Sequence, residues 1–406
     1  MSTQSAAAVE DAAIRPFTVN VPQEALDDLS RRLAATRLPE RETVTDFSQG
    51  VPLATMEKLV RYWEKDYDWR KVEARMNAYP HFITEIDGLD IHFIHVRSKH
   101  ENALPLIVTH GWPGSIIEQL KIIEPLTNPT ANGGTASNAF HVVIPSMPGY
   151  GFSGRPTRAG WGPQRIARAW NVLMKRLGYT RYVAQGGDWG AIIVDTMGVQ
   201  APPELLGIHS NMPGVITPEI DKAAGAGAPA PSGLSDEEKH AYEQLKFVYA
   251  KGVGYAYQMG LRPQTLYGIA DSPVGLAAYL LDHDARSLEL IARSFDGQVE
   301  GLTRDDVLDN ITLTWLTNTG VSSGRLYWER LAEGSGFGFF NVKGVTIPVA
   351  VSAFPDDLYQ APRSWAERAY PKLIYYNKPD KGGHFAAWEQ PDLLVYDIRE
   401  GLRSLR

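Results

Sequence analysis

The 406-residue sequence contains no cysteine. Disulfide bonds, thiolate nucleophiles and cysteine-ligated metal sites are therefore excluded. The chain also has no apolar run that approaches the ~18 residues of a membrane-spanning helix. No block of five or more like charges occurs and the formal net charge is −7, which argues against nucleic acid as a main partner. These absences fit a cytoplasmic protein, either as a monomer or as a homo-oligomer.

The beginning of the chain lacks the features of a signal peptide. Its first residues are polar and rich in alanine, without the basic and apolar regions that such a peptide requires. We predict a disordered tail over residues 1–15. Hydrophobic residues make up 44% of the chain and charged residues 21%, which is an ordinary globular composition. The length predicts one large core with insertions, or two units.

Apolar, strand-like runs alternate with helix-like segments through much of the chain. This alternation predicts an α/β fold with a largely parallel sheet that is covered on both faces by helices. The expected core strands are 104–108, 141–144, 181–184, 207–210, 346–353 and 372–376, and the expected crossover helices are 161–177 and 191–199. Ahead of this core we expect a helix over 53–65 and a hairpin that turns at Asp87-Gly88.

Residues 214–340 interrupt the alternation. A segment rich in alanine, glycine and proline, 223–233, predicts a flexible connection. Ser235 is followed three residues later by Glu238, which is a capping-box pattern for a helix over 236–251. Further helices are expected over 272–281, 305–318 and 324–332. We therefore divide the chain into an N-terminal segment (16–97), a core (98–213 and 341–406) and a helical lid (214–340).

The most informative stretch is Gly186-Gly187-Asp188-Trp189-Gly190, which lies between an expected strand and an expected helix. Strand, sharp turn and helix form the setting of a nucleophile elbow, in which a strained turn exposes one side chain above the sheet. Gly186 and Gly190 supply the small residues that the close backbone approach requires. Because Asp188 occupies the apex in place of serine, the expected nucleophile is a carboxylate that attacks an electrophilic carbon. The alternative is that Asp188 merely caps the helix.

A carboxylate nucleophile forms an ester, which must then be hydrolysed. This step needs a water that is deprotonated by a histidine, and the histidine needs a carboxylate to orient it. In this type of fold the chain order is nucleophile, acid, histidine. His384 and Asp357 follow the last two expected strands and fit these roles. Asp356 is a rival to Asp357 that the spacing does not exclude.

Hydrolysis also creates an oxyanion that needs backbone N–H donors. We expect these from Trp189, which follows the nucleophile, and from Trp112, in the loop after an earlier strand. His110 is expected to have a structural role near that loop. His92 and His95 lie three apart in an expected strand and so face opposite sides, which argues against a metal pair. The chemistry requires no metal and no organic cofactor.

These motifs together resemble the microsomal-type epoxide hydrolases of the α/β-hydrolase superfamily, over roughly residues 16–404. The resemblance implies a covalent two-step mechanism and two lid tyrosines that hydrogen-bond the epoxide oxygen. Tyr327 matches one of these by its motif, and Tyr255 matches the other, with Tyr257 as a nearby rival. The microsomal enzymes carry an N-terminal membrane anchor that this chain lacks, which implies a soluble bacterial or fungal relative.

The expected function is hydrolysis of a small-molecule epoxide to a vicinal diol through an ester of Asp188. A haloalkane dehalogenase shares the aspartate nucleophile, the histidine and the acid, but it needs a halide cradle in place of phenol donors. A ligand-binding homologue without turnover is the third alternative, although no member of the expected triad is missing. The sequence leaves open which epoxide is used, and whether the role is detoxification, catabolism or biosynthesis.

Overall fold

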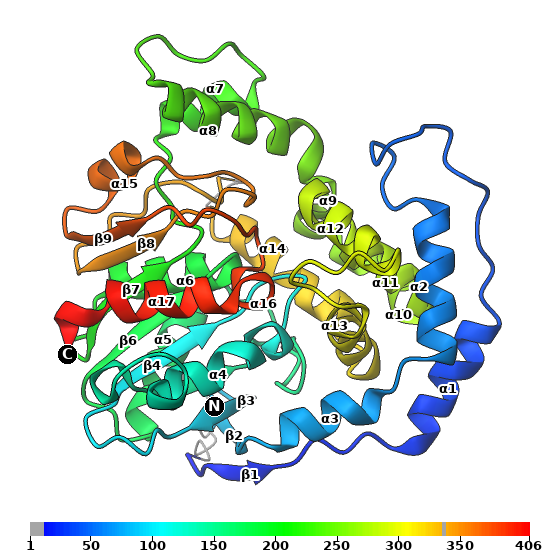
Figure 1. The fold of residues 1–406 in the computed structure, drawn as a ribbon, viewed down its shortest axis with the longest axis horizontal. Helices are drawn as coiled ribbons and strands as arrows, with labels where there is room; N and C mark the ends of the chain where they lie inside the picture. The colour runs from blue at the N-terminus through cyan, green and yellow to red at the C-terminus, as the bar shows by residue number, and fades with distance from the viewer. Residues whose placement is uncertain (1–11, 335–337) are drawn as a thin grey trace, which may run out of the picture.

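The computed structural model describes residues 12–334 and 338–406, and within them the chain is built around one nine-stranded sheet (Figure 1). The strand order is β1-β2-β3-β5-β4-β6-β7-β8-β9. The strands are β1 (Arg15–Phe17), β2 (His81–Ile86), β3 (Leu89–Val96), β4 (Leu104–Thr109), β5 (Phe140–Pro145), β6 (Tyr182–Gly186), β7 (Leu205–Ser210), β8 (Val349–Ser352) and β9 (Leu373–Asn377). Strands β4 to β9 run parallel, so the predicted parallel core sheet is confirmed.

All six expected core strands are present, with shifted ends. The largest difference is at β8, which was predicted from residue 346 and begins at Val349. Pro348 immediately precedes it and has no N–H to give to the ladder, although its carbonyl accepts the N–H of Ile208 at 3.0 Å. The proline therefore sets where this strand can start.

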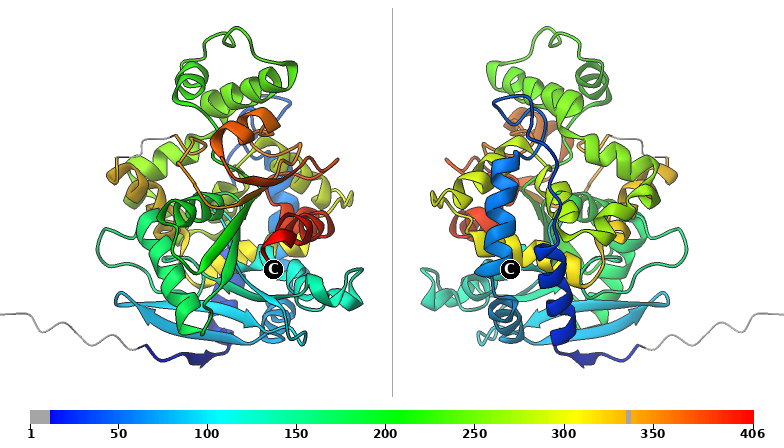
Figure 2. Two further views of the ribbon diagram at one scale, coloured as in Figure 1. Left: turned by 90° about the vertical axis from the view of Figure 1, so that its left-hand side faces the viewer. Right: turned by 90° about the vertical axis from the view of Figure 1, so that its right-hand side faces the viewer.

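Helices cover both faces of the parallel strands (Figure 2). On one face α5 (Pro163–Arg176) packs against α6 (Trp189–Gln200), and on the other α4 (Leu120–Thr127) packs against α17 (Pro391–Gly401). Helix α6 is buried along most of its length, as expected for a helix that is apolar on all sides. Two further helices of the core are α15 (Arg363–Ala369) and α16 (Ala386–Glu389).

The N-terminal segment extends the central sheet. Its strands β1, β2 and β3 add antiparallel pairs to the edge at β5, and the predicted hairpin turns at Asp87 and Gly88, both with positive φ. Its helices are α1 (Gln23–Ala34), α2 (Leu53–Lys65) and α3 (Trp69–Asn77). The predicted tail over 1–15 ends too late, because Arg15 already pairs with Ile83 in β1, and residues 1–11 lie outside the described part.

The lid is helical, as predicted, but its helices are more numerous than expected. They are α7 (Pro218–Gly225), α8 (Asp236–Phe247), α9 (Gly254–Leu261), α10 (Tyr267–Asp271), α11 (Pro273–Leu281), α12 (Ala285–Phe295), α13 (Arg304–Leu316) and α14 (Gly320–Ala332). Ile216 and Asn341 form a β-bridge, so the chain leaves and rejoins the core at one place.

Two predictions in the lid hold only in part. The connection expected to be flexible over 223–233 is helical in its first part, because Thr217 caps α7 and Pro218 begins it. The helix expected over 236–251 has the predicted capping box, but the α-helix ends at Phe247 and continues as a π-helical turn, η4 (Val248–Gly252). Such turns are frequent at functional sites.

Helices α9 to α13 lie between the sheet and the N-terminal helices α1 and α2 (Figure 1). Polar contacts join the N-terminal segment to the lid: the hydroxyl of Tyr62 donates to Asp305 and that of Tyr67 donates to Asp309, each at 2.8 Å. Helices α7 and α8 project from the rest of the molecule in both side views (Figure 2). Among the described residues, no helix has both the length and the apolar character needed to cross a membrane.

Candidate active site

Four loops meet at the carboxyl ends of the parallel strands, where open α/β sheets bind their ligands. The loops follow β4, β6, β8 and β9. They carry Trp112, Asp188, Asp357 and His384 respectively. These four residues, which are distant in sequence, are therefore brought to one edge of the sheet.

The turn at Asp188 is strained, with φ 51° and ψ −126°. Non-glycine residues seldom adopt positive φ, and such strain is found at functional sites. A Cβ atom on Gly186 would lie 2.2 Å from the backbone of Gly190, and one on Gly190 would lie 2.0 Å from the carbonyl oxygen of Thr109. Both glycines are required because the strand and helix backbones approach this closely.

The carboxylate of Asp188 makes no capping bond to α6, so the helix-cap alternative does not describe it. The backbone N–H of Trp112 donates to its Oδ1 at 2.7 Å. Its Oδ2 lies 3.3 Å from Nε2 of His384. Trp189, the second predicted N–H donor, is the buried first residue of α6, directly beside Asp188. One carboxylate oxygen thus faces a backbone N–H while the other faces an imidazole.

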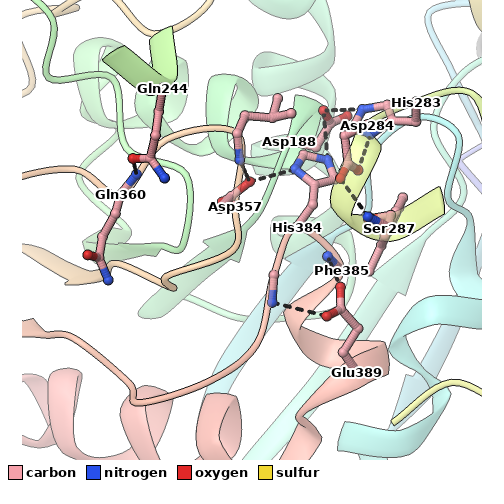
Figure 3. Close-up of polar contacts among 12 residues, drawn as sticks. Asp188, Gln244, His283, Asp284, Ser287, Asp357, Gln360, His384, Phe385 and Glu389 are labelled. Carbon is pink, nitrogen blue, oxygen red and sulfur yellow. Dashed lines mark hydrogen bonds and ion pairs between the residues drawn. The ribbon is translucent and has the colours of Figure 1, made fainter. Parts of the chain in front are cut away.

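Asp357, rather than Asp356, orients the histidine. Nδ1 of His384 donates to Oδ1 of Asp357 at 2.7 Å, and both side chains are buried (Figure 3). The same oxygen accepts the N–H of Leu358 at 2.7 Å. Asp356 is exposed and pairs through its backbone with Gly383. The two neighbouring aspartates therefore point in different directions, which their positions in the sequence do not reveal.

The charges of this group reinforce one another. Burial alone opposes a charged imidazole, but Asp357 and Asp188 together hold the pKa of His384 well above its usual value. Burial alone would raise the pKa of Asp188, yet His384 and the N–H of Trp112 keep it below its usual value. In the free enzyme, Asp188 is therefore an anion paired with a protonated His384.

The loop that carries His384 is fixed by a buried glutamate that the sequence analysis did not single out. Glu389, on α16, accepts the N–H of Gly383 at 3.0 Å and that of Phe385 at 2.9 Å (Figure 3). Burial raises the pKa of Glu389 to about 7. It holds the backbone on both sides of the histidine.

The two predicted tyrosines come from different lid helices that pack closely. Tyr255 lies in the first turn of α9 and Tyr327 lies in α14, with ring centroids 6.0 Å apart. A Cβ atom on Gly324 would lie 2.6 Å from Sδ of Met259, so this glycine permits the close packing of α9 and α14. Tyr257 is 43% exposed and does not line the cavity at Asp188, which Tyr255 and Tyr327 do.

Both tyrosines are held protonated. Burial is the main cause that raises their pKa values well above the usual range, and the charge of Asp188 adds to it. Tyr255 stacks on Trp112 with centroids 4.9 Å apart, and Tyr327 packs edge-on against Trp189 at 4.7 Å. The phenols can therefore serve as hydrogen-bond donors at neutral pH.

Two small cavities adjoin Asp188. The first is lined mainly by apolar side chains, with both tyrosines, and offers about 20 Å³ to the centre of a water molecule. The second is polar, offers about 10 Å³, and is lined by Glu118, Gln185 and Asn211 together with His384. A volume of this size is about that of one water. Asp188 thus separates an apolar cavity from a polar one.

Glu118 and His283 belong to this site, and the sequence analysis did not predict them. Glu118, in the short helix η1 (Ile116–Gln119), is buried, and burial together with Asp188 raises its pKa to about 8. His283 lies in the turn between α11 and α12, with Nε2 3.9 Å from Oδ2 of Asp188. Neither lies in the turn directly after a parallel strand: Glu118 is in η1, beyond the turn that follows β4, and His283 is in the lid. The pattern Asp282-His283-Asp284 between two apolar helices was the available signal for His283.

Within the described residues, one group of side chains is arranged so that it could bind a metal ion. Ligand atoms of Asp188, His283 and His384 lie within 4.8 Å of one another. The opposite charges of the carboxylate and the protonated His384 already account for that close approach. His92 and His95, expected to be structural, bond separate partners within the fold, His81 and Tyr179 respectively.

His110 bonds the backbone, as expected for a structural residue. Its Nδ1 donates to the carbonyl oxygen of Gly111 at 3.0 Å, and its Nε2 accepts the N–H of Met147 at 3.2 Å. Burial lowers the pKa of His110 to about 4. This neutral ring holds the loop that carries Trp112.

Comparison with known proteins identifies two family models in the chain. Residues 14–119 match the epoxide hydrolase N terminus, and residues 105–238 match the alpha/beta hydrolase fold. A protein of Stigmatella aurantiaca (strain DW4/3-1), provisionally named an epoxide hydrolase, is 50% identical over 97% of this chain and 86% of its own length. Epoxide hydrolase 1 of Sus scrofa is 36% identical over 97% of this chain and 89% of its own length.

Solved structures show the same similarity. The juvenile hormone epoxide hydrolase of the silkworm Bombyx mori is 30% identical, with a TM-score of 0.86 over 98% of this chain and 96% of that one. The Aspergillus niger epoxide hydrolase is 29% identical, with a TM-score of 0.81 over 98% of both chains. Taken with the relatives in sequence, these matches favour epoxide hydrolysis over dehalogenation or ligand binding. The chain belongs to the epoxide hydrolase family, has the α/β-hydrolase fold, and is an enzyme of that class.

Proposed function

We propose that this enzyme opens its epoxide through a covalent ester of Asp188, which His384 and Asp357 then hydrolyse. One observation carries the proposal: the anionic Asp188 lies between the N–H of Trp112 and the imidazole of His384, and shares a cavity with Tyr255 and Tyr327. Nucleophile, base and acids are thereby within reach of one bound molecule.

In the first step, Oδ2 of Asp188 attacks a ring carbon of the epoxide and the carbon–oxygen bond of the ring breaks. The departing oxygen carries the negative charge, which is unfavourable unless it is stabilised. Tyr255 and Tyr327 hydrogen-bond this oxygen and one of them protonates it. Their raised pKa values support the role because they keep both phenols protonated until the oxygen arrives.

In the second step, water attacks the Cγ atom of Asp188. His384, held by Asp357, takes the proton of that water, and Oδ1 becomes the oxyanion. The N–H of Trp112 already contacts Oδ1, and the N–H of Trp189 is the second donor. A positioned donor of this kind contributes roughly 3 kcal/mol to the stability of the transition state. The polar cavity beside His384 supports entry of water from that side.

The substrate we propose is a small-molecule epoxide with an apolar substituent. The cavity on the tyrosine side of Asp188 is lined by side chains such as Ile192, Met212 and Phe340. An apolar substituent is stabilised there by about 25 cal/mol for each Å² of surface that it buries. Neither step needs a metal or an organic cofactor.

Replacement of the tyrosines tests the assignment of the acids. Tyr255→Phe and Tyr327→Phe each remove one donor to the epoxide oxygen, so each is expected to lower the rate of ester formation by roughly 10²-fold. Stopped-flow or rapid-quench kinetics with an aryl epoxide measures this rate. Tyr257→Phe is the matched control, because Tyr257 does not line the cavity at Asp188. If ester formation in Tyr255→Phe and Tyr327→Phe is as fast as in Tyr257→Phe, the tyrosines are excluded as acids.

A further inference from the structure

A second imidazole lies over the nucleophile. His283 is buried in the lid, its Nε2 is 3.9 Å from Oδ2 of Asp188, and its ring centroid is 4.3 Å from that of His384 (Figure 3). This nitrogen has no hydrogen-bond partner among the residues the structure describes. A buried polar atom without a partner is costly, and it calls for an explanation. Nε2 of His283 faces Oδ2 of Asp188, the oxygen that forms the ester, and this direction suggests an explanation.

Asp284 fixes the orientation of this imidazole. Nδ1 of His283 donates to Oδ2 of Asp284 at 2.9 Å, and Oδ1 of Asp284 accepts the N–H of Ser287 at 2.8 Å (Figure 3). Although burial opposes its charge, the pKa of Asp284 is lowered to about 2, because His283 and the backbone bond stabilise the anion. Since Nδ1 is committed to this anion, Nε2 faces Asp188, as in the His384–Asp357 pair.

We propose that His283 is the general acid of ester hydrolysis, which protonates Oδ2 of Asp188 as the diol departs. The inference rests on the proposed function, in which Oδ2 forms the ester bond. When the tetrahedral intermediate collapses, the Cγ–Oδ2 bond breaks and Oδ2 leaves as an alcohol oxygen of the diol. That oxygen needs a proton at this moment, and Nε2 of His283 is directed at it.

The protons and electrons of the cycle balance. Water gives one proton to His384, its oxygen bonds to Cγ, and the electron pair of the ester carbonyl moves to Oδ1. The pair then returns, the Cγ–Oδ2 bond breaks, and Oδ2 takes the proton of His283. Asp188 is left as a carboxylic acid that returns a proton to His283. Before hydrolysis, the proton that His384 carries in the free enzyme passes to the tyrosine that protonated the epoxide oxygen, and the proton taken from water then replaces it on His384.

The different roles of His384 and His283 follow from their positions. His384 borders the polar cavity, whereas His283 does not, so the first imidazole is placed for the water and the second for the leaving oxygen. At 3.9 Å the contact of His283 is longer than a hydrogen bond, but such contacts tighten when substrate is bound. The titratable groups that face or adjoin His283 are Asp188, Asp282, Asp284, His384 and Tyr255.

Single-turnover kinetics of the full-length enzyme tests this role. In His283→Gln the ester is expected to form to nearly one equivalent per chain, while its hydrolysis slows by roughly 10²-fold or more. Rapid quench followed by intact-mass spectrometry measures both rates, and a full yield of ester shows that the variant is folded. Asp284→Asn is expected to slow hydrolysis less, because the imidazole remains. His240→Gln, at an exposed position of α8, is the matched control.

A second readout separates an acid from a structural residue. The defect of His283→Gln is expected to be smaller for epichlorohydrin than for 1,2-epoxybutane, because the chlorine makes the departing oxygen less basic and less dependent on a proton donor. An equal defect for both epoxides, or unchanged hydrolysis in His283→Gln, would overturn the proposal. If the wild-type enzyme forms no ester at all, the proposed function fails instead, so the two failures are distinguishable.

Discussion

At the scale of single residues, the charge of Asp188 controls the protonation of His384. The ion pair raises the pKa of His384 and lowers that of Asp188. The contribution of His384 to the stability of the fold is therefore fully present below the pKa of an unfolded histidine, ~6.5. That contribution is lost as the pH rises through the raised pKa of His384. On the aspartate side it is lost when the pH falls below ~3.9 and Asp188 becomes protonated. In the proposed mechanism, ester formation removes the same negative charge, so His384 can give up its proton and act as a base.

Asp188→Asn imitates the neutral ester, and it should lower the pKa of His384. The variant keeps the shape of the side chain but removes the anion 3.3 Å from Nε2. Titration of enzyme labelled with ¹⁵N-histidine, followed by NMR, measures the change directly. A pKa of His384 that is unchanged or higher in the variant would contradict the coupling between nucleophile and base.

The glycines of the elbow provide a second prediction at this scale. Gly190→Ala places a Cβ atom 2.0 Å from the carbonyl oxygen of Thr109, so the backbone must shift. We expect a loss of roughly 3 kcal/mol in the free energy of unfolding. Denaturant unfolding measures it, with Gly225→Ala as the control, because no atom lies within 4 Å of the Cβ position there. Similar losses in the two variants would argue against the steric explanation.

The sequence predicts those site residues that have a fixed relation to a strand. Asp188 and His384 each follow a parallel strand and are therefore found from order and spacing alone. Asp356 and Asp357 differ only in the direction of their side chains, which the backbone of the loop decides and spacing does not. His283 reaches the site through the packing of the lid on the core, so the pattern Asp282-His283-Asp284 alone does not reveal that it lies beside Asp188.

At the scale of elements, the N-terminal helices hold the lid through buried polar contacts. The hydroxyl of Tyr67 donates to Oδ1 of Asp309 at 2.8 Å, and Arg75 pairs with Oδ2 at 3.0 Å. Asp309 is buried in α13, and burial raises its pKa to about 7.

Tyr67→Phe is therefore expected to loosen the lid. Removal of the hydroxyl leaves a buried acceptor on Asp309 with one partner fewer, at a cost of roughly 1–3 kcal/mol. Thermal unfolding gives the loss of stability, and faster hydrogen exchange in α13 would locate it in the lid. Tyr396→Phe is the control because Tyr396 is 58% exposed. If both variants unfold and exchange like the wild type, the contact contributes nothing to the lid.

The elements of the core were easier to predict than those of the lid. Parallel strands are buried on both faces, so each appears in the sequence as a continuous apolar run that neighbouring turns delimit. The lid helices are short, and several are separated by a single residue or turn, such as α11 and α12 at Asp282 to Asp284. Their ends depend on caps and on contacts with the core, so the helical pattern predicts helix content better than helix number.

At the scale of the whole molecule, the N-terminal segment, the core and the lid share one cluster of buried apolar residues. The segment lengthens the sheet and supports the lid, and the lid brings Tyr255, Tyr327 and His283 over the strand ends that carry Asp188. The cavities at Asp188 are close to the size of single water molecules. Because an organic epoxide is larger, the cavity at Asp188 has to widen when the substrate is bound.

The covalent role of Asp188 is the central claim, and oxygen labelling of a single turnover tests it most directly. An excess of enzyme reacts once with the epoxide in ¹⁸O-water, and mass spectrometry measures the label in the diol and in the peptide that contains Asp188. The mechanism predicts an unlabelled first diol and one ¹⁸O atom in Asp188, because the diol takes its oxygen from the carboxylate. Label in that first diol, with none in Asp188, would show that water attacks the epoxide directly.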